Sequence, residues 1–145
     1  MNAVRVKILK EGARLPSYGS VEAAGADLYA CLEQPVEIAP GRTMFVPTGI
    51  ALEVPKGCAG LIYARSGMAC KRGLAPANKV GVVDSDYRGE ILVALHNHGQ
   101  ETQRVEHGER IAQFVITPVL TPDYVCAEEL SDTVRNTSGF GSTGK

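Results

Sequence analysis

Two acidic residues stand one position apart where an apolar run ends, in Val80-Gly-Val-Val-Asp84-Ser-Asp86-Tyr-Arg-Gly-Glu90. The apolar residues predict a strand that Asp84 closes. A carboxylate in that place could accept a proton from a water molecule held against a phosphate, as general-base catalysis requires. The alternative is a turn aspartate that bonds to its own backbone, a role that fits Asp86 better than Asp84.

A cation, a hydroxyl and a glycine amide follow one another in Ala64-Arg65-Ser66-Gly67-Met-Ala69. This segment precedes the one predicted helix, which spans 67–72 with Ser66 as its N-cap and ends at Gly73. Unpaired N–H groups at such a start favour an anion. Taken alone, the simpler interpretation is an ordinary cap, with Arg65 paired to a carboxylate.

The segment Gly139-Phe-Gly-Ser-Thr-Gly-Lys145 fits the first seven positions of a phosphate-binding P-loop. It lacks the preceding strand, the Ser or Thr after the lysine and the following helix that a working P-loop needs, so we reject that site. Glycine amides, two hydroxyls and the nearby Arg135 still suit a triphosphate. A disordered solubilising tail explains the composition equally well, although it leaves Phe140 in water.

The three histidines are His96, His98 and His107. His96-Asn-His98 places two imidazoles on one side of a strand, which could begin a metal site, but no third ligand is evident. We expect surface or turn histidines.

Short apolar runs recur between turn residues, and the regular spacing predicts an all-β sandwich or barrel. The runs expected as strands are 4–8, 36–38, 44–46, 50–54, 91–95 and 111–116. The helix is a decoration on this fold. From Ser131 the chain is rich in Ser, Thr, Asn and Gly, which cannot pack a core, so we expect a β domain over 1–130 and a mobile tail over 131–145.

Length and composition narrow the function classes. With 145 residues the chain suits one domain, and 15 Lys and Arg against 16 Asp and Glu give no basic surface for nucleic acid. No apolar run approaches the ~18 residues of a membrane span, and no signal-peptide core is present, so we expect an intracellular, cytoplasmic or nuclear protein without a membrane partner. The four cysteines form no Cys-x-x-Cys pair and are expected to be reduced thiols.

In order and spacing, five segments together closely resemble the motifs of the homotrimeric dUTPase family. The resemblance spans 24–145. The segments are Ala24-Gly-Ala-Asp27-Leu-Tyr-Ala30, Ala64–Ala69, Asn78 with Gly81–Glu90, Gly108-Glu-Arg110-Ile-Ala-Gln113, and Arg135 with Gly139–Gly144.

The resemblance implies Mg²⁺-dependent hydrolysis of dUTP to dUMP and pyrophosphate, which keeps uracil out of DNA and supplies dUMP for dTMP synthesis. Asp84 would be the general base for a water that attacks the α-phosphorus. Tyr87 would pack against the deoxyribose and exclude ribonucleotides. Asn78 and the backbone of a neighbouring hairpin, with Gly81 and Val83, would bind uracil.

The same resemblance assigns the phosphates to the second, fourth and fifth motifs. Arg65, Ser66, Gly67 and Gln113 would bind the phosphate chain. Asp27 is a supporting acid, with Arg110 more structural. Phe140 of the tail would stack on uracil, while Arg135, Gly141, Ser142 and Thr143 would meet the γ-phosphate end.

Mg²⁺ in this family is held by the triphosphate and by waters, so we expect no direct protein ligand, with Asp27 contributing at most through a water. The implied subunit is a β-barrel or distorted jelly roll in a homotrimer whose three sites are each built from all three chains. Exchange of strands between subunits would also shield exposed sheet edges.

Two positions depart from the family pattern, and two other functions stay open. Ala26 stands where an aromatic residue is common, and Tyr63-Ala64 stands where a proline usually precedes Arg-Ser-Gly. The alternatives are a dCTP deaminase-like enzyme of the same fold, which would carry glutamate at the catalytic position, and a non-catalytic trimeric regulatory module.

Overall fold

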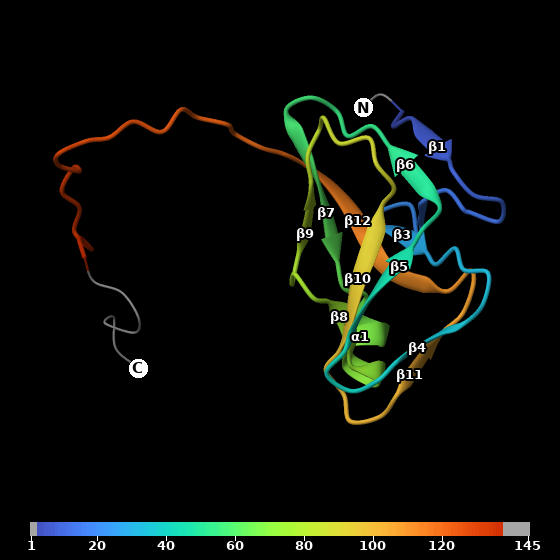
Figure 1. Cartoon of the computed structure of the whole chain (residues 1–145). Coiled ribbons are helices and arrows are strands. Elements are labelled where there is room, and N and C mark those ends of the chain that lie inside the picture. The colour runs from blue at the N-terminus through green and yellow to red at the C-terminus, as the bar shows by residue number, and fades with distance from the viewer. Residues whose placement is uncertain (1–2, 138–145) are drawn as a thin grey trace.

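The computed structural model describes residues 3–137, and this part of the chain is mostly β with one short helix (Figure 1). Most strands are only two to six residues long, because Pro and Gly turns interrupt the apolar runs at short intervals. The elements in chain order are β1 Val6–Ile8, β2 Ser17–Tyr18, β3 Ala26–Tyr29, β4 Val36–Ile38, β5 Thr43–Pro47, β6 Ile50–Leu52, β7 Cys58–Tyr63, α1 Ser66–Arg72, β8 Leu74–Pro76, β9 Gly81–Val83, β10 Leu92–Asn97, β11 Gln103–Val105 and β12 Arg110–Pro118.

The strands form four sheets. The largest has the order β2-β3-β12-β7-β9, a second has the order β5-β10-β8, and the pairs β1-β6 and β11-β4 complete the body. All of these pairings are antiparallel. The expected β fold is confirmed. A closed barrel is not present in residues 3–137. The largest sheet has β2 and β9 at its two edges, and no hydrogen-bonded ladder joins these edges in the described residues.

The core lies between the sheets and is filled by aliphatic side chains from nearly every strand. On β10 the side chains alternate, with Val93 and Leu95 buried and Leu92 exposed. Leu95, Ile38 and Val105 are completely buried. β12 is the longest strand and pairs with both β3 and β7, so it carries the center of the largest sheet.

Each of the six runs expected as strands overlaps a strand, with boundaries that shift by a few residues. The helix ends as expected, because Gly73 adopts a left-handed φ of 65° and its N–H bonds to the Met68 carbonyl. The expectation that Ser66 is the N-cap is wrong. Arg65 caps the helix with extended backbone, and no side chain caps it by a hydrogen bond.

After β12 the chain leaves the body as an extended segment, residues 119–137, drawn in orange to red in Figure 1. All of its residues are exposed, and none is in a strand or helix. The domain body therefore ends near Pro118. Within residues 3–137, no helix is long and apolar enough to cross a membrane.

Candidate functional site

A pocket of about 210 Å³ lies where β9 meets the loop after it. Five of the residues predicted for the site line it: Asn78, Gly81, Val83, Asp84 and Tyr87. The pocket is completed by Ile62, Val82, Glu90, Ile91 and Leu92. The structure thus brings together the predicted catalytic acid, the predicted sugar contact and the predicted base contacts on one wall.

β9, the strand before Asp84, pairs with a largely buried part of β7. Val83 is opposite Gly60, and Gly81 is opposite Ile62. Asp84 follows the last strand residue and is exposed. The Tyr87 amide bonds to the Asp84 carbonyl at 3.2 Å, which closes a turn directly after the acid. The acid is therefore held at the pocket mouth by a strand on one side and a turn on the other.

The far end of the same loop is anchored by Glu90. Its Oε1 accepts the Gly49 amide at 2.8 Å, and the Tyr87 hydroxyl donates to the Glu90 carbonyl at 3.1 Å. Arg88 Nη1 donates to the carbonyls of Ser85 and Tyr87, each at 2.8 Å. These bonds fix the loop from 84 to 90 without any bound molecule.

The segment before β9 is a tight turn, in which Lys79 has a left-handed φ of 66°. Asn78 is exposed there, and a Cβ on Gly81 would lie 3.1 Å from Asn78 Nδ2, so glycine leaves room for the amide. The expectation of a hairpin is wrong in one respect: the two strands that flank this turn, β8 and β9, do not pair with each other in the described residues. The strands flanking this turn pair elsewhere, β8 with β10 and β9 with β7.

A second cluster lies at the other end of β7 and centers on Asp27. This carboxylate is 9% exposed and pairs with Arg65 Nε at 2.7 Å and with Arg110 Nη1 at 3.3 Å. Asp27 and Arg110 lie on neighbouring strands, β3 and β12, while Arg65 follows β7. The pairing of Arg65 with a carboxylate, which we weighed against phosphate binding, is present.

Gln113 belongs to the same region. Its Nε2 donates to the Ala64 carbonyl at 2.8 Å, and a Cβ on Gly25 would lie 2.6 Å from its Oε1. Ser66 and Gly67 are exposed at the first turn of α1. The residues of the second and fourth motifs that are predicted to bind phosphates, and the supporting acid Asp27 of the first motif, therefore gather around the start of the helix.

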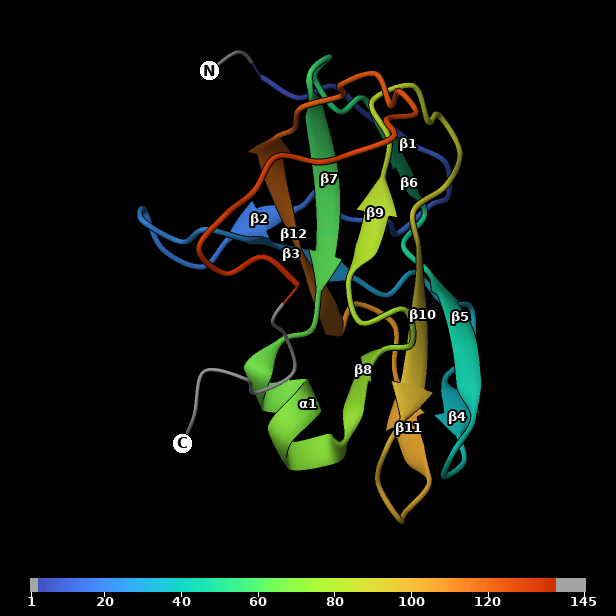
Figure 2. The ribbon, with the colours of Figure 1, turned by 90° about the vertical axis from the view of Figure 1, so that its left-hand side faces the viewer.

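Asp84 and the Asp27 cluster lie toward opposite ends of β7. Because Val83 is opposite Gly60 and Gly81 is opposite Ile62, Asp84 continues away from α1, as Figure 2 shows by the direction of the β9 arrow. Asp84 is level with about Ala59, and Arg65 follows six residues later along extended backbone, a separation of roughly 20 Å at ~3.3 Å per residue. One chain therefore presents the two halves of the predicted site at a distance from each other.

The fifth motif is only partly within the described residues. Arg135 is exposed in the segment after β12. Phe140, Gly141, Ser142 and Thr143 lie outside residues 3–137.

The histidines form a pair near the turn of Lys79. The ring centroids of His96 and His98 are 4.4 Å apart, and His96 Nδ1 is 2.9 Å from Thr43 Oγ1. Desolvation, and then repulsion by His96 and Lys79, lower the pKa of His98 below its usual value. Within residues 3–137, no group of three or more His, Cys, Asp or Glu side chains could hold a metal ion.

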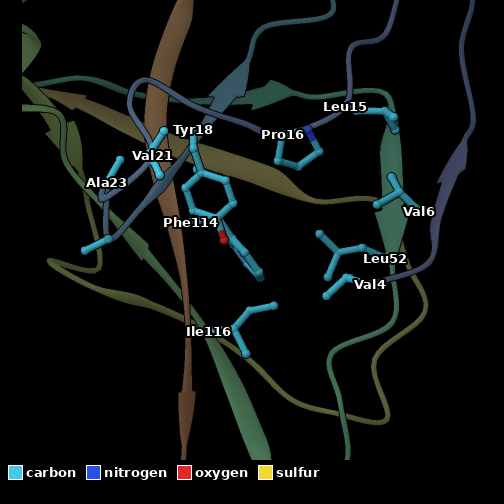
Figure 3. Close-up of a pocket in the computed structure, with 12 residues that line it drawn as sticks. Val4, Val6, Leu15, Pro16, Tyr18, Val21, Ala23, Leu52, Phe114 and Ile116 are labelled. Carbon is cyan, nitrogen blue, oxygen red and sulfur yellow. The ribbon is translucent and has the colours of Figure 1, made fainter. Parts of the chain in front are cut away.

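A separate apolar pocket of about 540 Å³ opens between the N-terminal segment and β12 (Figure 3). Val4, Val6, Leu52, Phe114 and Ile116 contribute to its walls, and no predicted site residue does. Its chemistry suits a hydrophobic chain segment rather than a nucleotide.

Arg88, Gly89 and Glu90 are not among the predicted site residues, although they lie in the third motif, Gly81–Glu90. Glu90 accepts a long-range hydrogen bond from the Gly49 amide. The Arg88 side chain bonds to the Ser85 carbonyl of its own loop, and the Tyr87 ring lies against Gly89. The only local signal is the dense run of charged and glycine residues after Tyr87. Nothing in the spacing predicts the partner Gly49.

Comparison with known proteins supports the arrangement. The dUTPase family model matches residues 11–144. The chain is 49% identical over 149 residues to the deoxyuridine 5'-triphosphate nucleotidohydrolase of Desulfitobacterium hafniense (strain DSM 10664 / DCB-2), with 99% of each chain covered. It is 48% identical over 132 residues to the protein of that name in Acinetobacter baumannii (strain AYE), covering 90% of this chain and 88% of the other.

Solved structures agree. The Staphylococcus bacteriophage 80alpha dUTPase with dUPNHPP matches with a TM-score of 0.92 and 29% identity over 100% of both chains. A point mutant of the dUTPase from phage phi11 of S. aureus, described with a structural Mg(II) ion, matches with a TM-score of 0.82 and 25% identity over 90% of this chain and 100% of that one.

The fold, the acid-bearing pocket and these matches define a hydrolase of nucleotide metabolism. The chain belongs to the dUTPase family. It is an enzyme that hydrolyses dUTP.

Proposed function

We propose that this enzyme cleaves dUTP to dUMP and pyrophosphate, with Asp84 as the general base. The observation that carries the proposal is that the exposed Asp84 lines the same pocket as Asn78, Gly81, Val83 and Tyr87. The reaction would remove dUTP, so that uracil stays out of DNA, and would supply dUMP for dTMP synthesis.

In the proposed step Asp84 takes a proton from a water molecule as the water oxygen bonds to the α-phosphorus. The bond from that phosphorus to the bridging oxygen breaks, and pyrophosphate leaves with the electron pair. The turn between Asp84 and Tyr87 holds the acid in place before substrate arrives, which lowers the entropic part of the barrier.

Selectivity for a deoxyuridine nucleotide would come from the pocket walls. Asn78 and the backbone near Gly81 would bond to the uracil edge, so that cytosine leaves buried polar groups mispaired. The tight turn leaves little space for a thymine methyl. The Tyr87 ring would occupy the space of a 2'-hydroxyl and exclude ribonucleotides by steric conflict.

The phosphates would be bound by the cluster around Asp27. Arg65 and Arg110 supply two cations there, while Ser66 and Gln113 supply polar side chains. Asp27 holds both arginines through its two oxygens, so its role is to position them. Residues Arg135, Phe140, Gly141, Ser142 and Thr143 would close over the γ-phosphate and the base.

We propose Mg²⁺ as the cofactor, held by the triphosphate and by waters. The donor set fits this mode, because Asp27 is engaged by two arginines and no cage of three acidic or imidazole groups exists in residues 3–137. When bound, the ion neutralises charge on the phosphate oxygens. Asp27 would reach it only through a water.

A homotrimer with shared sites would join the two halves. Asp84 and Arg65 are roughly 20 Å apart along β7 in one subunit, and a nucleotide in the Asp84 pocket would meet the Arg65 cluster of a second subunit. The third subunit would contribute its tail.

The segment after β12 supports such an exchange. Leu120 and Tyr124 are 95% and 96% exposed, which is unusual for large apolar side chains. The apolar pocket of Figure 3 would receive this segment from a second copy of the chain. Arg5 and Lys7 beside the pocket complement the acidic Glu128 and Glu129 of the segment in charge.

The test is a substrate panel with purified protein and Mg²⁺. We expect release of pyrophosphate from dUTP and little from dCTP, dTTP or UTP, while Asp84→Asn abolishes turnover but still binds nucleotide, as titration calorimetry with a non-hydrolysable analogue can show. Asp86→Asn is the matched control, because that acid is assigned only to the turn.

Three results would contradict the proposal. Full activity of Asp84→Asn would remove the base assigned here. Ammonia release from dCTP would favour the deaminase alternative. Nucleotide binding without turnover in the unmodified protein would favour a regulatory module.

A further inference from the structure

Gly89 lies under the ring of Tyr87. A Cβ built on Gly89 would lie 2.3 Å from the Tyr87 hydroxyl oxygen and 2.6 Å from its Cζ. Both distances are far below a permitted contact. Tyr87 can fold back across its own loop only because residue 89 has no side chain.

The backbone at this position does not demand glycine. The left-handed glycines in residues 3–137 are at 12, 41, 49, 57, 73 and 108, and Gly89 is not among them. An alanine at position 89 therefore avoids the left-handed penalty that applies at those positions. The space under the tyrosine ring is the remaining structural reason for glycine.

The position of the ring is further fixed by a tether. The Tyr87 hydroxyl donates to the Glu90 carbonyl at 3.1 Å, and Glu90 is held by the Gly49 amide at 2.8 Å. Tyr87 is 45% exposed, so it does not pack in the core. Contacts within the loop must therefore hold the ring in place.

We propose that Gly89 is a specificity-determining positioning residue, which sets the Tyr87 ring in the place where it rejects a 2'-hydroxyl before any nucleotide binds. The inference rests on the proposed function, in which Tyr87 faces the sugar. Gly89 acts through Tyr87 and does not touch substrate.

The direction of the expected change follows from which atoms can move. A methyl group on residue 89 meets the far end of a flexible, exposed side chain, so the ring swings outward and loses its bond to the Glu90 carbonyl. The wall against the 2'-hydroxyl then opens. UTP gains access, whereas dUTP loses only a packing contact.

The experiment measures kcat/KM for dUTP and for UTP in the unmodified protein, Gly89→Ala and Tyr87→Phe. Gly89→Ala should raise the UTP to dUTP ratio about tenfold, the lower end of what a steric pocket contributes to discrimination. Tyr87→Phe removes only the tether and should raise the ratio less. Gly19→Ala is the control, because a Cβ there meets nothing within 4 Å.

A double-mutant cycle separates this role from a general structural one. In a Tyr87→Ala background, adding Gly89→Ala should leave the UTP to dUTP ratio unchanged, because the ring through which Gly89 acts is gone. A merely structural glycine would lower both rates in either background and leave the ratio unchanged.

The outcomes are distinct. If the unmodified protein does not prefer dUTP over UTP, the proposed function fails first. If it does prefer dUTP and the ratio is unchanged in Gly89→Ala, the role of Gly89 is overturned, whatever the ratio in Tyr87→Phe. If Gly89→Ala fails to fold, the test is Tyr87→Phe, which releases the ring from the Glu90 carbonyl. An unchanged UTP to dUTP ratio in that variant would then overturn the proposal.

Discussion

Asp27 is nearly buried, yet both of its carboxylate oxygens have cationic partners. Arg65 and Arg110 approach from two other parts of the chain, one beyond β7 and one on β12. A buried carboxylate is tolerated when it is paired in this way. The arginines in turn are held in fixed positions, which lowers the entropy that they lose when they bind a phosphate chain.

We predict that Asp27→Asn raises the KM for dUTP and lowers the free energy of unfolding by about 1–3 kcal/mol, because two charged hydrogen bonds are weakened. Steady-state kinetics and urea unfolding at one protein concentration measure the two effects. Glu33→Gln, an exposed acid away from this cluster, is the control. Unchanged KM and an unchanged unfolding midpoint would show that Asp27 does not position the arginines.

For single residues, the sequence predicts which neighbours in the chain group together better than it predicts which distant residues they contact. Asp84, Asn78 and Tyr87 stand close together in the chain, so local pattern suffices to group them. The bond between Glu90 and Gly49 joins residues 41 positions apart, and the contact between Gly89 and Tyr87 depends on ring placement. Neither follows from residue type or spacing.

The neighbouring strands β7 and β12 pack closely where Gly60 meets Phe114. A Cβ on Gly60 of β7 would lie 2.1 Å from Cζ of Phe114 on β12, so the phenyl ring lies directly on the glycine. Phe114 also faces the apolar pocket of Figure 3. The glycine therefore lets the ring pack onto the sheet between the core and this pocket.

We predict that Gly60→Ala lowers the free energy of unfolding by about 1–3 kcal/mol through overpacking. Combining it with Phe114→Leu should cost less than the sum of the single changes, because the shorter side chain makes room for the methyl group. Urea unfolding at fixed protein concentration measures this, with Gly19→Ala as the open-space control. Strict additivity would show that the two residues are not coupled.

Two of the strands that the sequence did not predict, β3 and β7, share a cause. In β7, Gly60 interrupts an apolar run, and in β3 a charged residue, Asp27, takes a buried position. Both violate the patterns by which strands are recognised, and both serve contacts made across the sheet. Runs in which no glycine or buried charge breaks the apolar pattern, such as 36–38 and 50–54, are recognised from that pattern.

For the whole molecule, the main feature is the separation of the two halves of the site along β7 and β9 (Figure 2). The sequence resemblance implied a shared site, but only the strand register shows that Asp84 and Arg65 lie toward different ends of one subunit. This separation does not follow from the sequence, because register depends on which strands pair.

We predict that two inactive variants restore activity when they assemble together. In the proposed trimer, co-expression of Asp84→Asn with Arg65→Gln should recover roughly a third of the full rate in mixed assemblies, because every trimer that contains both variants has one of its three shared sites with both residues intact. The measurement is dUTP turnover of doubly tagged, purified assemblies.

The control pairs Asp84→Asn with the double variant Asp84→Asn, Arg65→Gln, in which no shared site can be complete. Recovery in the first mixture alone supports sharing. A first mixture as inactive as its parents would place both residues in the same subunit's site.

The same register has a genetic consequence. In the proposed trimer, a chain with both Asp84 and Arg65 replaced would inactivate one site through its missing acid and a second through its missing cation, so that one defective copy would disable two sites of three. Such an allele would be dominant over an intact one, while two alleles with single, complementary defects would partly rescue each other.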